Sequence, residues 1–155
     1  SAASDVYKRQ DDLIVWRAST GTWYWLTSSS QYDYVMAGAK QWGSQALGDV
    51  PMMGDFDGDG RADPAVWRPT DGTWYWLTSS SGYAYASQGA RQWGSNALGD
   101  KPLVGDFDGD HRSDLAVWRA TTGNTDTGGC RWRTSRGRRW PASSGWPTKS
   151  GKSIA

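Results

Sequence analysis

The stretch DFDGDGRAD, residues 55–63, brings four aspartates and two glycines into nine positions. A near-copy, DFDGDHRSD, occupies residues 106–114. Four carboxylates this close together repel one another unless a cation or protonation compensates their charge. The two copies lie 51 residues apart, so they also indicate that the chain repeats a structural unit.

The middle of the chain follows the same 51-residue period. Three further segments recur at this spacing: VWR around residues 16, 67 and 118, GTWYWLTSSS from residues 21 and 72, and QWGS from residues 41 and 92. A helical repeat is disfavoured because the chain lacks an apolar period of about 3.6 residues, and a parallel β-helix would need shorter coils. A period of this length is typical of propellers, solenoids and arrays.

Within one unit, four segments mix apolar and polar positions over strand-like lengths, between clusters of Gly, Asp, Pro or Ser. They are residues 63–69, 72–80, 83–94 and 101–106. The twelve Trp, seven Tyr and twenty Gly of the chain also favour strands and turns over helices. The sequence therefore predicts an all-β fold, a partial β-propeller of four-stranded antiparallel blades with a 51-residue repeat. Because propellers close with about 4–8 blades, we expect the remaining blades in a longer parent chain.

The repeat divides the chain into three parts. Residues 11–122 hold a partial blade, a full blade and the start of the next. Residues 1–10 break the repeat abruptly, since only Asp12 remains of the expected acidic loop, and we interpret them as foreign or artefactual sequence. Residues 123–155 are predicted to be a basic irregular tail whose Arg, Gly, Ser and Trp content fits a shifted reading frame. A disordered native tail and a basic nucleic-acid-binding tail are the alternatives, and we expect no nucleic-acid partner.

The first acidic loop offers a ligand set made only of oxygen. Side chains at loop positions 1, 3, 5 and 9, together with the carbonyl at position 7, can converge on one cation if the backbone coils tightly, which Gly60 at position 6 permits. Ca²⁺ takes about 6–8 oxygen ligands, whereas Zn²⁺ prefers nitrogen and sulfur. The loop therefore predicts a Ca²⁺ site formed by Asp55, Asp57, Asp59, Arg61 and Asp63.

Two other interpretations of the acidic loops are disfavoured by the sequence. An EF-hand loop starts almost identically but needs a bidentate Glu at position 12. Position 12 is Val66 in the first loop and Val117 in the second, each inside an apolar segment, so the EF-hand is excluded. A plain Asp/Gly turn with solvated charges is disfavoured by the repulsion between its carboxylates.

These loops, inside a unit of four predicted strands, resemble the FG-GAP or VCBS-type repeats of integrin α-subunit propellers and secreted bacterial proteins. In that family the loop binds Ca²⁺ through positions 1, 3, 5, 7 and 9. The resemblance implies a second site formed by Asp106, Asp108, Asp110, Arg112 and Asp114. His111 stands where the pattern prefers Gly, and because His tolerates the left-handed conformation better than most residues, we expect a somewhat weaker second site.

The sequence favours binding over catalysis. The chain has one His, one Cys (Cys130) and no Glu, and it lacks a catalytic triad, a phosphate loop and a catalytic zinc pattern, so we expect no enzyme. No apolar run approaches the ~18 residues of a membrane span. The resemblance implies a secreted or cell-surface, bacterial module for binding or adhesion to a glycan or an extracellular protein. The alternative is a purely structural accessory module of a secreted hydrolase.

The repeated tryptophans have two interpretations. They can fill the space between blades, or they can stack on the apolar face of a sugar ring. Trp42 and Trp93 follow the fourth predicted strand at a Gly-Ser turn, outside the predicted calcium-strand core. They are therefore the candidate glycan contacts, although packing at a blade junction is the favoured role.

Overall fold

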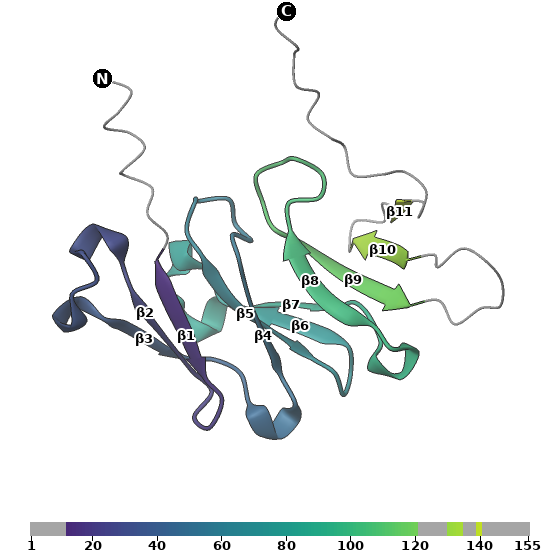
Figure 1. The fold of residues 1–155 in the computed structure, drawn as a ribbon, viewed down its shortest axis with the longest axis horizontal. Helices are drawn as coiled ribbons and strands as arrows, with labels where there is room; N and C mark the ends of the chain where they lie inside the picture. The colour runs from purple at the N-terminus through teal and green to yellow at the C-terminus, as the bar shows by residue number, and fades with distance from the viewer. Residues whose placement is uncertain (1–11, 121–129, 135–138, 141–155) are drawn as a thin grey trace, which may run out of the picture.

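The computed structural model describes residues 12–120, 130–134 and 139–140. Within them the chain forms three antiparallel sheets that follow one another across the molecule (Figure 1). The first sheet contains, in spatial order, β1 (Leu13–Arg17), β2 (Thr22–Leu26) and β3 (Gly38–Gln41). The second contains β4 (Val50–Gly54), β5 (Asp63–Arg68), β6 (Thr73–Trp76) and β7 (Gly89–Gln92). The third contains β8 (Lys101–Gly105), β9 (Asp114–Ala120), β10 (Cys130–Thr134) and β11 (Arg139–Trp140).

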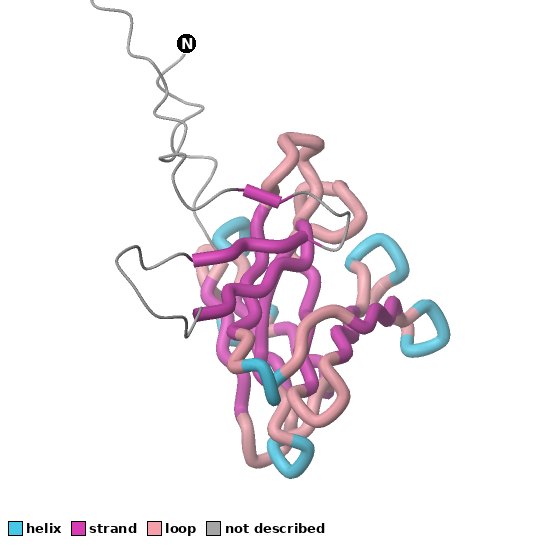
Figure 2. Tube along the Cα trace, turned by 90° about the vertical axis from the view of Figure 1, so that its right-hand side faces the viewer, coloured by secondary structure: helices cyan, strands magenta, loops and turns pink. Residues whose placement is uncertain are grey.

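The prediction of an all-β chain with antiparallel sheets is confirmed, since the described residues contain no α-helix. Single turns of 3₁₀-helix occupy the connections, outside the strands (Figure 2). They are η2 (Ser28–Ser30), η3 (Tyr34–Met36), η4 (Gln45–Leu47), η5 (Ser79–Ser81), η6 (Tyr85–Ser87) and η7 (Asn96–Leu98).

The strand predicted over residues 83–94 is wrong in its length. Only β7 is extended in a sheet, and η6 takes the preceding part of the segment. Gly82 and Tyr83 both have positive φ, 64° and 58°, so the backbone turns just where the strand was expected to begin. The strand starts at Gly89, which pairs with Trp76 and lies under its indole ring, where no side chain would fit.

Tryptophans organise the faces of the sheets. Trp67 of β5 pairs across the strands with Trp74 of β6, and both indole Nε1 atoms donate to the carbonyl oxygen of Trp93, at 3.2 and 2.9 Å. Trp16 and Trp23 of the first sheet donate to the carbonyl of Trp42 in the same way. In each of these two sheets one backbone carbonyl thus satisfies two indole N–H groups.

The main apolar core lies between the second and third sheets. Trp67 and Trp74 pack there against Leu115 and Val117 of β9. Partly buried side chains complete the cluster: Val50, Met52, Phe56, Trp76, Trp93 and Val104. The core therefore joins two sheets and does not belong to either one alone.

Two ion pairs join the start of one unit to its second strand. Arg68 donates to both carboxylate oxygens of Asp49, at 2.9 and 3.0 Å, and Arg119 makes the equivalent pair with Asp100. Both carboxylates are buried, and each also accepts a backbone N–H, from Ser44 and Ser95 respectively. Their charges are therefore compensated by bidentate contacts of the kind that buried aspartates require.

Two predictions fall wholly or partly outside the described residues. Residues 1–10, interpreted as foreign sequence, lie outside them, and of the predicted tail 123–155 only β10 and β11 are described. Both interpretations stay predictions. Among the described residues, no helix has the length and apolar character needed to cross a membrane.

Candidate metal centres

Each acidic loop connects the first two strands of a sheet. The first loop leaves β4 at Gly54 and enters β5 at Asp63, and these two residues are the last pair of the β4–β5 ladder. The second loop has the same place between β8 and β9, where Gly105 pairs with Asp114. The last aspartate of each loop therefore belongs to a strand, and the other aspartates lie in the turn that connects the two paired strands.

The first carboxylate of the loop shapes the turn. Asp55 accepts three backbone hydrogen bonds, from the N–H groups of Gly58 (2.6 Å), Asp59 (3.1 Å) and Gly60 (2.8 Å). Gly58 and Gly60 both adopt φ of 82°, a conformation that glycine reaches without strain. The backbone therefore coils around Asp55, as the spacing of the aspartates predicts.

This coil brings three of the four carboxylates of the first loop together. Asp55, Asp57 and Asp63 each place an oxygen so that the three atoms lie within 4.8 Å of one another. Asp63 is fully buried, and it accepts N–H groups of Phe56 and Ser79 at 2.8 and 2.7 Å. Burial raises the pKa of Asp63 to about 6, and the charges of Asp57 and Asp55 add to the rise. A cation here would relieve that repulsion, so the three residues could hold a metal ion.

Asp59 lies outside this group of three. Its carboxylate accepts the hydroxyl of Ser79 at 2.6 Å and the N–H of Arg61 at 2.8 Å. Asp57 accepts the hydroxyl of Ser80, and this hydrogen bond lowers the pKa of Asp57. The serines of η5 therefore donate hydrogen bonds to two aspartates of the loop. The sequence did not predict this contact. The ligand roles predicted for Asp59 and for the carbonyl of Arg61 stay predictions.

The second loop repeats the geometry. Asp106 accepts N–H groups of Gly109, Asp110 and His111, and the oxygens of Asp106, Asp108 and Asp114 lie within 4.8 Å of one another. Asp110 accepts the N–H of Arg112 at 2.9 Å, as Asp59 does from Arg61. His111 has φ of 66°, so it does adopt the left-handed conformation expected of it.

The two loops also contact each other. The N–H of Asp55 donates to the hydroxyl of Ser113 (2.9 Å), and the N–H of Ser113 donates to the carbonyl of Asp55 (2.6 Å). The guanidinium of Arg112 donates to the carbonyl of Asp57 at 2.6 Å. Sequence reasoning considered each loop alone, so it missed this contact between neighbouring sheets.

The aromatic candidates lie at the boundaries between sheets. Trp42 donates from Nε1 to the carbonyl of Tyr75 in the second sheet at 3.3 Å, and its ring stacks on that of Tyr85, with centroids 6.1 Å apart. Trp93 is half-buried against the core between the second and third sheets. These contacts are those of residues that join sheets. Their role as glycan contacts stays a prediction.

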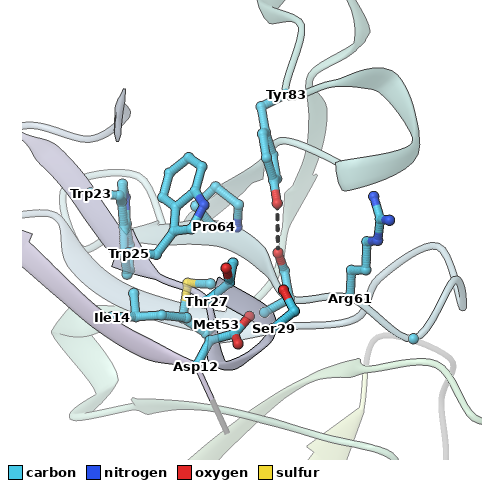
Figure 3. A pocket seen from close by; sticks show the side chains of 12 residues that line it. Asp12, Ile14, Trp23, Trp25, Thr27, Ser29, Met53, Arg61, Pro64 and Tyr83 are labelled. Carbon is cyan, nitrogen blue, oxygen red and sulfur yellow. Dashed lines mark hydrogen bonds between the residues drawn. The ribbon is translucent and has the colours of Figure 1, made fainter. Parts of the chain in front are cut away.

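A cavity of about 710 Å³ lies between the first two sheets (Figure 3). Its walls include Trp23 and Trp25 of β2, Met53 of β4 and Tyr83, and the charged residues Asp12 and Arg61 also line it. At the next boundary, Phe56 packs against Trp76, which lies 51 residues after Trp25. Trp25 thus lines a cavity, whereas its counterpart Trp76 packs against a loop phenylalanine.

Comparison with known proteins finds one similar family. Residues 55–117, which span both acidic loops, match the model of the FG-GAP-like repeat. No curated protein and no solved structure matches the chain at a significant level.

Proposed function

Because residues 55–117 match the model of the FG-GAP-like repeat, we propose that the chain is a Ca²⁺-stabilised, non-catalytic module for extracellular binding or adhesion. The observation that carries this proposal is the convergence of three carboxylate oxygens within 4.8 Å in each of the two loops. Without a counter-charge, each group would place repelling charges around a buried aspartate.

The chemistry of the loops favours Ca²⁺ over other metals. Every candidate ligand atom is an oxygen, and hard cations prefer oxygen, whereas thiolate or imidazole ligands would favour zinc or copper. Three carboxylates with room for carbonyl and water oxygens suit the flexible shell of 6–8 ligands that Ca²⁺ takes at about 2.3–2.6 Å. The FG-GAP-type loops that the sequence resembles hold the same ion.

The arrangement of the sheets supports a propeller. In the second sheet the strands follow one another in chain order from β4 to β7, as in a propeller blade. The first strands of the second and third sheets, β4 and β8, contact each other, while the later strands lie further along each sheet. We therefore interpret the sheets as consecutive blades whose first strands line the propeller axis.

The module acts outside the cell in this proposal, on a bacterial surface or as part of a secreted protein. Extracellular Ca²⁺ modules bind the ion with a dissociation constant of about 10⁻⁴–10⁻³ M. The partner is a glycan or an extracellular protein. The second candidate, a purely structural accessory module of a secreted hydrolase, rests on the packing of Trp42 and Trp93 between sheets.

Thermal unfolding with and without Ca²⁺ tests the proposal. An ion bound only by the native state adds RT ln(1 + [L]/Kd), about 1.4 kcal/mol at ten times Kd. We expect millimolar Ca²⁺ to raise Tm and Asp57→Asn to reduce that rise. Asp71→Asn is the matched control, because Asp71 lies in an exposed turn outside both loops. An identical Tm in excess chelator and in excess Ca²⁺ contradicts the proposal.

A further inference from the structure

The two acidic loops lie beside each other at the same end of the second and third sheets (Figure 1). The first strands of these sheets, β4 and β8, are in contact. Gly54 ends β4, and a side chain here would place its Cβ 2.6 Å from Cγ1 of Val104 and 2.8 Å from Cβ of Ser113. The first loop therefore leaves its strand directly against the second loop, with no space for a side chain between them.

One side chain of the second loop reaches the first loop. The guanidinium of Arg112 donates to the carbonyl of Asp57 at 2.6 Å, and the rest of its side chain lies against Gly58. A Cβ added to Gly58 would lie 3.0 Å from Nε of Arg112 and 3.1 Å from its Cγ. Arg112 therefore contacts the main chain at Asp57, whose carboxylate is one of the three that converge in the first loop.

The segment that Arg112 contacts is rich in glycine. Gly58 and Gly60 have φ of 82°, and glycine loses more backbone freedom on folding than any other residue. A loop that is already ordered binds its ligand more tightly, because less conformational entropy is lost on binding. A hydrogen bond to the carbonyl just before Gly58 therefore lowers the entropic cost of bringing Asp57 to an ion.

Position in the chain alone would assign Arg112 to the second loop. It is the seventh residue of that loop, its N–H donates to Asp110 at 2.9 Å, and its carbonyl is a predicted ligand of the second site. Its guanidinium, however, donates to the first loop. The main chain and the side chain of this one residue thus belong to different candidate metal centres.

We propose that Arg112 is a positioning residue for the first metal centre, although it belongs to the second loop. This role rests on the proposed Ca²⁺ binding and adds a residue outside the first loop that sets the affinity there. The contact, and not the charge, is the cause. A positive charge near a cation weakens its binding by repulsion, so removal of the charge alone would tighten the first site.

A Ca²⁺ titration followed by NMR of the backbone amides separates the two centres. The N–H groups of Gly60 and Gly109 each donate to the first aspartate of their own loop, so each amide reports on one loop. We expect Arg112→Gln to weaken the affinity that Gly60 reports by about threefold to fivefold, the effect of one hydrogen bond of ordinary strength, and to change the affinity that Gly109 reports by less. Arg112→Lys keeps the charge and a donor, so it should weaken the first site less than Arg112→Gln does.

Lys101→Gln is the matched control. It removes the same charge from the exposed first residue of β8, at the end of the strand away from the loop, and it should leave both titrations unchanged. Amide hydrogen exchange in chelator adds a measurement that needs no bound ion. Arg112→Gln should speed exchange at Gly58 and Gly60 more than at Gly109.

Three results would overturn the role of Arg112. If neither Gly60 nor Gly109 responds to Ca²⁺ in the wild type, the proposed function fails together with this role. If the wild type titrates at Gly60 but Arg112→Gln leaves that affinity unchanged or tightens it, the role of Arg112 alone is wrong. A larger loss of affinity at Gly109 than at Gly60 also overturns it, because Arg112 would then act within its own loop.

Discussion

Asp55 and Ser113 exchange two hydrogen bonds although they lie 58 residues apart in the chain and belong to different acidic loops. Ser113 receives the N–H of Asp55 on its hydroxyl and donates its own N–H to the carbonyl of Asp55. The other loop therefore holds the main chain at the first aspartate of this candidate metal centre. The two loops therefore contact each other directly as well as folding around their own aspartates.

Replacing Ser113 should weaken the first loop without touching any carboxylate. Ser113→Ala leaves the N–H of Asp55 without its acceptor, and we expect a loss of about 1 kcal/mol in the free energy of unfolding. Ca²⁺ affinity should fall at the first loop. Isothermal titration and chemical unfolding measure the two effects. Ala62 occupies the same position in the first loop, so Ala62→Ser is the matched control and should change neither quantity.

Replacing His111 by glycine should improve the second loop. His111 has φ of 66°, and a residue other than glycine pays about 1–2 kcal/mol for this left-handed conformation. Glycine removes that cost, but part of the gain is offset because glycine loses more chain entropy on folding. We expect a net gain of about 0.5 kcal/mol and tighter Ca²⁺ binding. Gly60→His is the reverse change, and nothing lies within 4 Å of the Cβ it would add, so it should be destabilising through the backbone alone. If His111→Gly and Gly60→His changed the free energy of unfolding in the same direction, this explanation would be contradicted.

Asp63 should make the stability of the metal-free chain depend on pH. Its pKa rises from 3.8 to about 6 on folding, mainly because it is buried, so the native state binds a proton more tightly than the unfolded state. In chelator, the contribution of Asp63 to the free energy of unfolding is therefore greatest below about pH 4 and is lost as the pH rises through about 6. Saturating Ca²⁺ should remove this loss, because the ion stabilises the ionised carboxylate.

Chemical unfolding at a series of pH values checks this prediction. Asp63→Asn should flatten the profile between these limits. Asp57→Asn should leave most of the slope in place, because burial raises the pKa of Asp63 more than the charge of Asp57 does. A profile that Asp63→Asn leaves unaltered would count against burial of Asp63 as the cause.

Trp42 distinguishes packing from ligand binding. Its ring stacks on Tyr85 and its Nε1 atom bonds to Tyr75, so Trp42→Ala should destabilise the chain by about 2 kcal/mol through lost contact between the first two sheets. A thermal melt and a glycan array on the same preparations separate the two roles. Binding lost by Trp42→Ala or Trp93→Ala at unchanged Tm would assign these residues to a ligand site.

Much of the local structure could be predicted because each feature depends on residues close together in the chain. The strands around Trp67 and Trp74 follow from alternation and flanking turn residues, and the coil of the acidic loop follows from the spacing between Asp55 and Gly60. Asp12 shows how local this information is. It accepts the N–H of Ser28, as Asp63 accepts that of Ser79, although the loop before it no longer resembles the repeat.

The features that the sequence did not predict depend on contacts between residues that lie far apart in the chain. Residues 83–94 have a strand-like composition, yet Tyr85 lies in η6 and reaches the first sheet, where Trp42 and Gln41 receive it. The contact of Asp59 with Ser79 was also missed, because the two residues meet only when η5 folds back toward the loop.

The sequence by itself determined the repeat, the antiparallel strands and the carboxylates available to a cation, because these depend on period, alternation and turn chemistry within one unit. Only the tertiary structure decided which carboxylates converge, which tryptophans join sheets and which apolar face stays uncovered. These depend on how one sheet lies against the next: Val66 is buried against Gly43 of the first sheet, whereas the equivalent Val15 is exposed, since no sheet among the described residues packs against it.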